Sequence, residues 1–505
     1  MPSDLVIVYH RQPYEEVLEN GEVVFRENKS PNGIVPTLKS FFGTVEQCSW
    51  VAWKQADTPE EADFPRVVRI QDSYGEYKVS RLPLRSDQVK SFYHVTSKEA
   101  LWPILHSFPE KYDYDPVDWS QFREVNWLFA EAAAAEATDD AIVWVHDYNL
   151  WLTPAYLRQI NPRLKVAFFH HTPFPAPDVF NILPWREEIV DSLLACDLVG
   201  FHIPRYAANF VNVARGLRDV QITESIAVEP GLSPVGRALS EPTIPFKLAH
   251  EGRIIHMDAC PVGTNANYIS DIVERDATCA QVETIRAGLN GRRLLISVGR
   301  SDYTKGTLDM LETYQRLLER RPELRGQVQL LCVSVAANGN MTVYQQVQQD
   351  IEAAVGRING RYATLDWQPI LLFTGGIPFE QLVAYYRAAD VCWITPLRDG
   401  LNLVCKEYVA AREGLGGALI LSEFTGAAVE MPHALLTNPY STRAMDAVVD
   451  QALDMPEEEQ QHRMAKLLES VRNYDHNHWA NHTMQRFAEL RHPQASAVSD
   501  DVDLA

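Results

Sequence analysis

Short apolar runs recur along the chain and alternate with stretches whose apolar positions follow a helical period. The clearest runs are LVIVYH (5–10), AIVWVHD (141–147), KVAFFHH (165–171), DLVGFH (197–202), LLISVG (294–299), QLLCVSV (329–335), ILLFTG (370–375) and DVCWIT (390–395). Runs that are apolar on both faces are typical of parallel strands covered by helices. Strands that alternate with helices predict a doubly wound α/β architecture.

The chain has 505 residues, and a single hydrophobic core stops growing near ~250–300 residues, so two large domains are expected. A stretch rich in proline and glycine, 230–245, suits neither a strand nor a helix and lies shortly before the boundary. We predict an N-terminal domain over 1–260, a C-terminal domain over 261–475, a helix over 476–493 that packs back on the first domain, and a disordered acidic tail over 494–505. Two such domains in series predict a ligand cleft at the carboxyl ends of their strands.

Charge narrows the choice of partner, since 46 Lys and Arg against 67 Asp and Glu give a net charge of −21. Nucleic acid and anionic membranes require a basic face, so neither is expected as a specific partner. No apolar run approaches the roughly 20 residues that cross a bilayer, and the first one is too short for a signal peptide. The seven cysteines lack Cys-x-x-Cys spacing, which favours buried thiols over disulfides or a metal site. We expect a cytoplasmic protein.

Two cations follow the run LLISVG and precede a helical pattern over 307–320. Arg300 and Lys305 lie five residues apart at this junction. Together with the N–H groups at a helix start, such a pair can offset the charge of a diphosphate. A solvated basic loop would have the same spacing, so the spacing alone leaves both interpretations open.

A second set of polar residues follows the run DVCWIT. Asp399 and Gly400 predict a sharp turn, and the segment from Leu401 to Ala411 has the pattern of a helix whose first N–H groups can hold phosphate. Asp399 suits sugar hydroxyls, and Glu407 suits a ribose diol. The alternative is a helix cap at Asp399 and an ordinary helical glutamate.

Two histidines end neighbouring apolar runs. Asp147 follows His146, and His171 precedes a proline-fixed backbone, Thr172 to Pro175. A single histidine is more often structural than catalytic, but its place at the predicted cleft favours a functional role. Arg11 follows the first run, and SPNGI (30–34) is weak evidence for a glycine loop over a phosphate.

Six motifs, taken together, are more specific than any one of them: VHDYN (145–149), HTPFP (171–175), DLVGFH (197–202), GRSDYTKG (299–306), GRINGRYATLDWQPI (356–370) and DGLNLVCKE (399–407). In this order they resemble the trehalose-phosphate synthase family, glycosyltransferase family 20, from the first strand to about Trp479. The resemblance implies a retaining glycosyltransferase of GT-B architecture. A protein of this architecture has two facing Rossmann-like doubly wound domains, and the resemblance implies that the active site lies in the interdomain cleft.

The resemblance also implies roles for single residues. The residues expected to carry catalysis are Arg300, Lys305, His171 and Asp399. Arg300 and Lys305 match the pair that binds the donor's diphosphate, and Glu407 matches the ribose carboxylate. The donor site is further expected to include Asn32, Gly33, Ile377, Asp399, Gly400, Leu401, Asn402, Leu403 and Val404. The acceptor site is expected to include Arg11, Tyr93, Trp102, Asp147 and Asn338.

Departures from the family pattern concern the acceptor. Trehalose-phosphate synthases carry an arginine that clamps the phosphate of glucose 6-phosphate, and Asn338 takes its place here. Loss of one such clamp costs on the order of 1.5–3 kcal/mol for that ligand, enough to change acceptor preference. YHR (9–11), SPNGI (30–34) and FYHVTSKEALWP (92–103) are similar to the glucosylglycerol-phosphate synthase branch.

That branch moves glucose from ADP-glucose to glycerol 3-phosphate and makes the precursor of the compatible solute glucosylglycerol, which protects against osmotic stress. The alternative is a trehalose-6-phosphate synthase that uses UDP- or ADP-glucose and glucose 6-phosphate. An inactive nucleotide-sugar sensor is disfavoured because Arg300, Lys305, Asp399 and Glu407 are all present. The resemblance implies no metal and no cofactor. We leave open the nucleotide, regulation by salt, whether the chain forms a homo-oligomer and whether it is functionally coupled to a phosphatase.

Overall fold

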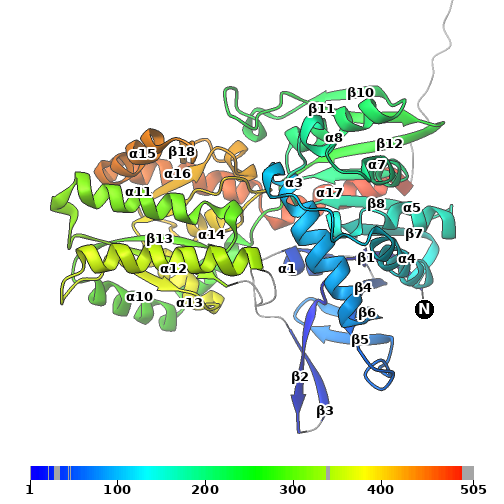
Figure 1. Ribbon diagram of the computed structural model, residues 1–505, viewed down its shortest axis with the longest axis horizontal. Coiled ribbons are helices and arrows are strands. Elements are labelled where there is room, and N and C mark those ends of the chain that lie inside the picture. Colours follow the sequence, from blue (N-terminus) through cyan, green and yellow to red (C-terminus); the bar gives the residue numbers. More distant parts are fainter. Residues whose placement is uncertain are drawn as a thin grey trace, which may run out of the picture.

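The computed structural model describes residues 2–20, 22–27, 34–43, 45, 47–336 and 342–491. Two α/β lobes lie side by side, each built on one large sheet with helices on its faces (Figure 1). The predicted fold class, two doubly wound domains of GT-B type, is confirmed. The predicted tail over 494–505 lies outside the described residues.

The N-terminal sheet has ten strands, and its centre is parallel because its buried strands are apolar on both faces. In spatial order the strands are β10 (Gln221–Ala227), β11 (Thr243–His250), β12 (Arg253–Ala259), β9 (Leu198–Phe201), β8 (Lys165–His170), β7 (Ala137–His146), β1 (Ser3–Val8), β4 (Cys48–Gln55), β6 (Gly75–Leu84) and β5 (Val67–Asp72). Antiparallel strands form both ends of this sheet. A hairpin of β2 (Tyr14–Glu19) and β3 (Glu22–Glu27), which the sequence pattern did not predict, projects from the lobe (Figure 1).

The helical segments of this lobe include an unusual π-helix, η2 (Lys90–Leu101). The others are α1 (Ile34–Lys39), η1 (Ser40–Gly43), α2 (Ser86–Val89), α3 (Trp102–Leu105), η3 (Pro109–Lys111), α4 (Trp119–Glu136), η4 (Tyr148–Leu150), α5 (Thr153–Ile160), α6 (Pro177–Phe180), α7 (Arg186–Leu194), α8 (Pro204–Leu217) and η5 (Pro230–Leu232). The π-helix matters for the site because π-helical turns are frequent at functional positions.

The C-terminal sheet has six parallel strands. They are β15 (Ile370–Phe373), β14 (Val328–Val335), β13 (Arg293–Arg300), β16 (Val391–Ile394), β17 (Ala418–Ser422) and β18 (Leu435–Thr437). Its helical segments are α9 (Ala266–Glu274), α10 (Asp276–Leu289), η6 (Tyr303–Lys305), α11 (Thr307–Arg320), η7 (Pro322–Leu324), α12 (Thr342–Tyr362), α13 (Phe379–Ala388), α14 (Val404–Ala411), η8 (Gly426–Val429), α15 (Thr442–Asp454) and α16 (Glu457–Asn473). The strand order reverses between β13 and β16, which is where ligands bind in such sheets.

The last helix, α17 (His476–Arg491), returns to the N-terminal lobe. Trp479 is fully buried and stacks on Trp144 of β7 with ring centroids 5.4 Å apart. His482 Nε2 lies 2.9 Å from Asp258 Oδ1 at the end of β12. These contacts tie the end of the described chain to the first sheet.

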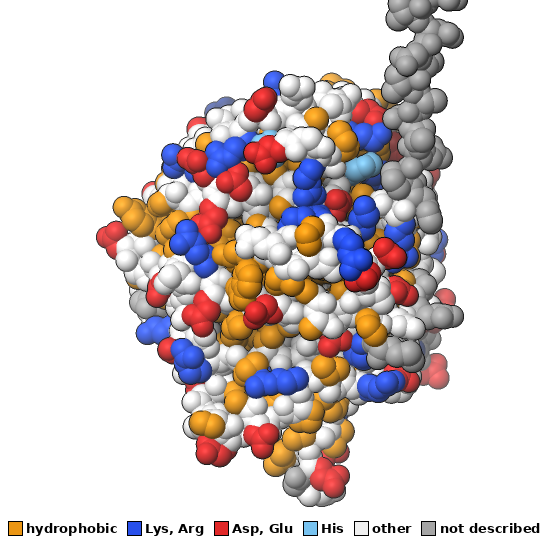
Figure 2. Space-filling model, turned by 90° about the vertical axis from the view of Figure 1, so that its right-hand side faces the viewer, with side chains coloured by type: hydrophobic (Ala, Val, Ile, Leu, Met, Phe, Trp, Pro, Cys, Tyr) orange, Lys and Arg blue, Asp and Glu red, His pale blue; other side chains and the backbone are white. Residues whose placement is uncertain are grey.

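Three features of the structure bear on possible partners: the distribution of surface charge, the polarity of the helices and the grouping of potential metal ligands. On the face shown in Figure 2, Lys and Arg side chains are interspersed with Asp and Glu rather than gathered in one basic area. Within the described ranges, no helix has the length and apolar content that a membrane crossing requires. Nor does any group of three or more His, Cys, Asp and Glu in those ranges form a metal-binding arrangement.

Candidate active site

The two cations predicted to bind the donor lie at the carboxyl edge of the six-stranded sheet. Arg300 ends β13, and the carboxylate of Asp302 accepts the backbone N–H of Thr304 at 2.9 Å, which fixes the turn into η6. Lys305 ends η6, and Gly306 follows at φ 63. A Cβ on Gly306 would lie 2.4 Å from the carbonyl oxygen of Thr395, so this tight turn requires glycine. The turn brings the Lys305 side chain close to β16.

Lys305 and Asp399 form an ion pair at this edge. Lys305 Nζ donates to Asp399 Oδ2 at 2.7 Å, and Asn402 Nδ2 donates to the same oxygen at 3.1 Å. Burial is the largest single influence and raises the pKa of Asp399, but the charge and hydrogen bond of Lys305 together with the hydrogen bond of Asn402 hold that pKa below its ordinary value. Asp399 is therefore an anion at neutral pH, and its remaining lone pairs can accept hydrogen bonds from sugar hydroxyls.

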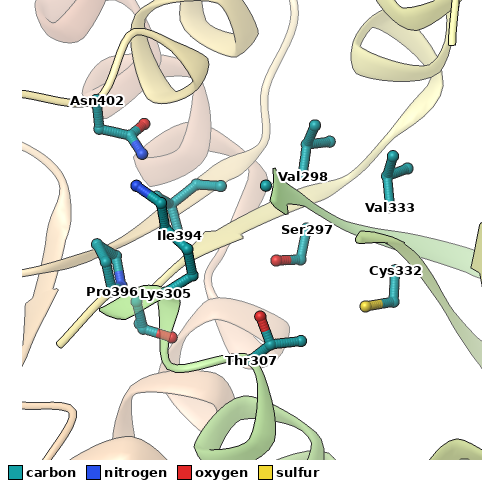
Figure 3. A pocket seen from close by; sticks show the side chains of 11 residues that line it. Ser297, Val298, Lys305, Thr307, Cys332, Val333, Ile394, Pro396 and Asn402 are labelled. Carbon is teal, nitrogen blue, oxygen red and sulfur yellow. The ribbon is translucent and has the colours of Figure 1, made fainter. Parts of the chain in front are cut away.

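A small cavity of about 20 Å³ lies between the ends of β13, β14 and β16. Figure 3 shows the Lys305 ammonium ending beside the Asn402 side chain, with the hydroxyls of Ser297 and Thr307 pointing toward the same space. A cavity of this size admits about one water-sized group. The bulk of a nucleotide sugar must therefore lie outside it, along the sheet edge.

The start of α14 differs from the prediction. We expected a helix from Leu401, but α14 begins at Val404. Asn402 adopts φ 79, a left-handed conformation that interrupts a helix, and its Oδ1 accepts the N–H of Cys405 at 3.1 Å. Asn402 therefore caps the helix with one side-chain group and holds Asp399 with the other, while Leu401 is buried.

Glu407 lies on α14 and is only 2% exposed. Tyr386 Oη donates to its Oε2 at 3.3 Å, and burial raises the pKa of Glu407 to about 7. Glu407 thus gains or loses its proton near neutral pH.

The predicted donor residues Ile377, Leu403 and Val404 are partly buried apolar side chains that pack against a hydrophobic core cluster.

The acceptor-side residues lie at the carboxyl edge of the ten-stranded sheet and on η2. Arg11, shortly after β1, donates from Nη2 to Tyr93 Oη at 3.3 Å, and its carbonyl accepts the indole N–H of Trp50 at 2.8 Å. Trp102 begins α3 and is 6% exposed. A cavity of about 420 Å³ lies beside Arg11 and Tyr93, and its lining consists of His10, Arg11, Trp53, Gln55, Val89, Tyr93 and His94. Its volume suits a small substrate.

Asp147 follows β7 in a strained conformation. Its φ of 69 and ψ of 164 place it in a region that residues other than glycine rarely adopt, at a cost of ~1–3 kcal/mol. Its N–H donates to the carbonyl of Phe169 at 2.9 Å, and its carboxylate accepts the N–H of His171 at 3.3 Å. Burial raises the pKa of Asp147 to about 6. Strain held in place by neighbouring groups is frequent at functional sites.

His171 lies in a group of buried rings. Its Nε2 is 3.0 Å from Nδ1 of His146, and burial together with the neighbouring histidines lowers the pKa of His171 well below its ordinary value. The ring is therefore neutral. A neutral imidazole can exchange hydrogen bonds with a sugar hydroxyl but adds no positive charge to the site.

Contacts between the lobes join the donor and acceptor sides. The guanidinium carbon of Arg300 lies 5.5 Å from the ring centroid of Trp102. Tyr206 Oη donates to the carbonyl oxygen of Asp399 at 3.2 Å. These contacts bring predicted residues of the two lobes, Arg300 and Trp102, next to each other and place Asp399 against the N-terminal lobe.

Three predicted residues, Asn32, Gly33 and Asn338, lie outside the described residues. In contrast, Lys98 lies within the motif FYHVTSKEALWP, but the sequence predicted no role for it; it is 8% exposed, and its Nζ lies 4.0 Å from the ring centroid of Trp102. A signal existed, because Lys98 precedes Trp102 by four residues, a spacing that places two side chains on one helix face.

Comparisons with known proteins show which family has a similar sequence. The chain matches the family model of Glycosyltransferase family 20 over residues 3–489. It is 55% identical to the glucosylglycerol-phosphate synthase of Synechocystis sp. over 485 residues, covering 96% of this chain and 97% of that protein. The glucosylglycerol-phosphate synthase of Picosynechococcus sp. is also 55% identical, with coverage of 99% and 98%.

Among solved structures, the chain is similar to an α,α-trehalose-phosphate synthase (UDP-forming) from Burkholderia xenovorans in complex with glucose-6-phosphate. The TM-score is 0.81 at 28% sequence identity, and the match covers 96% of this chain and 100% of that chain. The two-domain arrangement is therefore shared over nearly the full length.

Proposed function

The chain belongs to glycosyltransferase family 20, and from this premise we propose that it moves glucose from ADP-glucose to glycerol 3-phosphate with retention of the α configuration. It is a hexosyltransferase, as its motifs predict. The proposed product is 2-O-(α-D-glucosyl)-glycerol 3-phosphate, the precursor of a compatible solute. One observation carries the choice of acceptor: the identity is 55% to a glucosylglycerol-phosphate synthase but 36% to a trehalose-6-phosphate synthase.

On the donor side, Arg300 and Lys305 stabilise the negative charge that grows on the leaving diphosphate. An ammonium has three N–H donors, and one of those on Lys305 is taken by Asp399. The others can bind phosphate oxygens, and the N-terminus of α11 adds backbone N–H groups nearby. Charged groups that are fixed before the reaction stabilise the transition state without reorganising, and in many enzymes this accounts for most of the rate enhancement.

At the sugar, Asp399 accepts hydrogen bonds from glucose hydroxyls and His171 orients the ring as a neutral partner. The acceptor hydroxyl approaches the anomeric carbon from the face that the diphosphate leaves. The new C–O bond forms as the bond to the diphosphate breaks, and the leaving phosphate takes the hydroxyl proton. Front-face attack of this kind retains the α configuration without a covalent glycosyl-enzyme.

The proposal needs no cofactor and no metal, because Arg300 and Lys305 supply the positive charge at the diphosphate. It also assumes small-molecule substrates and a location in the cytoplasm. ADP-glucose rather than UDP-glucose as donor follows from the family branch and not from a contact of the base.

A two-by-two assay of the purified full chain tests the proposal. The donors are ADP-glucose and UDP-glucose, the acceptors are glycerol 3-phosphate and glucose 6-phosphate, and nucleoside diphosphate release is the readout. We expect the highest kcat/KM with ADP-glucose and glycerol 3-phosphate. A higher value with glucose 6-phosphate would instead assign the chain to trehalose 6-phosphate synthesis.

A further inference from the structure

Lys98 is a buried cation that none of the roles above uses. It lies on η2 and is 8% exposed. Its Nζ is 4.0 Å from the ring centroid of Trp102, 5.6 Å from that of Tyr93 and 5.8 Å from that of Tyr148. Among the residues that the structure describes, no carboxylate oxygen lies within ion-pair distance of its Nζ, although the carboxylates of Asp302 and Asp147 interact with it electrostatically at longer range. Aromatic rings, and no directly paired anion, thus form the nearest contacts of the Lys98 ammonium among the described residues.

Aromatic contacts alone do not account for a charge in this position. A cation–π interaction recovers only part of the free energy that an ammonium loses on leaving water. Burial lowers the pKa of Lys98 to about 8, so the ammonium form persists at neutral pH, and the long-range attraction of Asp302 is opposed by the nearby cations Arg300 and Arg11. A buried charge of this kind fits a site that is completed by an anionic ligand.

Two further cations approach the same rings. Arg11 donates to Tyr93 Oη at 3.3 Å, and the guanidinium carbon of Arg300 lies 5.5 Å from the centroid of Trp102. Arg300 forms an ion pair with Asp302 at 3.6 Å, whereas Lys98 interacts with Asp302 and Asp147 only at longer range. Arg300 at the end of β13, Lys98 on η2 and Arg11 after β1 therefore lie close to one another. The rings that they contact are those of Tyr93 and Trp102.

The cavity beside these rings has a second polar group without a partner. His10 is 4% exposed and lines the space of about 420 Å³ together with Arg11 and Tyr93. Neither ring nitrogen of His10 has a hydrogen-bond partner among the described residues. Arg11, Tyr93 and His10 line this cavity, and the Lys98 ammonium lies next to the Tyr93 ring, so a ligand that carries a phosphate and hydroxyl groups would place anionic and polar atoms next to these groups.

We propose that Lys98 binds the phosphate of the acceptor and supplies the cation that trehalose-phosphate synthases supply from the arginine position occupied here by Asn338. The inference rests on the proposed function, because it needs a phosphorylated acceptor. In glycerol 3-phosphate, two carbons separate the reacting oxygen from the phosphate ester oxygen. In glucose 6-phosphate, a pyranose ring separates them. The shorter acceptor therefore needs its phosphate partner closer to the reacting oxygen.

The test compares Lys98→Met, which removes the charge and keeps the length of the side chain, with Lys98→Arg, which keeps the charge. Lys90→Met is the matched control, because Lys90 is an exposed lysine at the start of the same π-helix. The measurements are KM and kcat for glycerol 3-phosphate, KM for ADP-glucose, and slow transfer to unphosphorylated glycerol.

We expect Lys98→Met to raise KM for glycerol 3-phosphate roughly 10- to 100-fold, as loss of a charged hydrogen bond does. The KM for ADP-glucose and the transfer to glycerol should stay within about twofold of the unchanged protein, since neither uses that phosphate. Lys98→Arg should recover part of the loss. If Lys98→Met melts at a lower temperature than the unchanged protein, the same measurements are made on Lys98→Gln, which also removes the charge.

Two results would overturn the assignment. One is a KM for glycerol 3-phosphate in Lys98→Met equal to that in Lys90→Met. The other is an equal loss with glycerol and glycerol 3-phosphate, which would mean that Lys98 only supports the fold. If the unchanged protein prefers glucose 6-phosphate, the proposed function fails. The same variants then test Lys98 with that acceptor, so the two failures are distinguishable.

Discussion

Gly400 packs directly against the backbone of the other domain, so one added methyl group there perturbs the site without changing a charge. A Cβ on Gly400 would lie 2.4 Å from the carbonyl oxygen of His171 and 3.1 Å from Cα of Thr172. Both neighbours are backbone atoms, which cannot rotate away as a side chain can. Gly400→Ala therefore forces the two domains apart at the active site.

The size of the effect follows from these distances. Ordinary Cβ contacts begin at 3.4 Å, so the backbone of His171 must retreat by about 1 Å. Overpacking of this kind costs ~1–3 kcal/mol of stability. A misplacement of about 1 Å at reacting groups costs roughly 100-fold in rate. We expect kcat to fall roughly 100-fold, with a decrease in Tm of only a few degrees.

Steady-state kinetics with both substrates and thermal melting of the same samples measure the two effects. Gly288→Ala on α10 is the control, because a Cβ there meets no heavy atom within 4 Å. The control should keep its kcat and melt at the same temperature or slightly higher. If Gly400→Ala kept the kcat of the control, close contact of the domains at Gly400 would not be what positions the site.

Three further predictions concern charge and protonation. Lys305→Met should lower kcat at least ~100-fold, since it removes a cation from the diphosphate and leaves the carboxylate of Asp399 without its ion-pair partner. Retention of near-normal kcat would contradict the role of Lys305. The pKa of Glu407 is about 7 and its carboxylate form accepts the ribose diol, so KM for the donor should fall as pH rises through about 7. Glu407→Gln should remove the pH dependence of KM for the donor. An unchanged pH profile in the variant would argue against the role of Glu407 in binding the ribose. Dialysis against EDTA should leave kcat within about twofold, because Arg300 and Lys305 supply the charge that a metal would otherwise supply; a loss restored by Mg²⁺ would refute this.

The positions of the main strands could be predicted because buried parallel strands are continuous apolar runs. Runs such as LLISVG and AIVWVHD coincide with β13 and β7. Since the carboxyl ends of parallel strands meet at one edge, the same pattern correctly placed Arg300 and Asp147 at sheet edges. The two-stranded hairpin β2–β3 has no comparable signal, because most of its residues are exposed or partly exposed.

The finer details of the site depend on contacts that the sequence does not show. The helix predicted from Leu401 begins at Val404, because Asn402 turns to φ 79 and its side chain binds both Asp399 and the helix start. Lys98 lies within the motif FYHVTSKEALWP and four residues before Trp102, but neither feature shows that its side chain is buried. Its burial comes from Trp102 and other rings brought together by the fold.

The most direct test of the central claim is a competition reaction in which the product, rather than the rate, is identified. The full chain receives ADP-glucose with equal concentrations of glycerol 3-phosphate and glucose 6-phosphate, and NMR identifies the linkage and anomeric configuration of the glucoside formed. The account predicts glucose joined in the α configuration to the central oxygen of glycerol 3-phosphate. Trehalose 6-phosphate as the main product would contradict the proposed acceptor, and a β-glucoside would contradict the retaining mechanism.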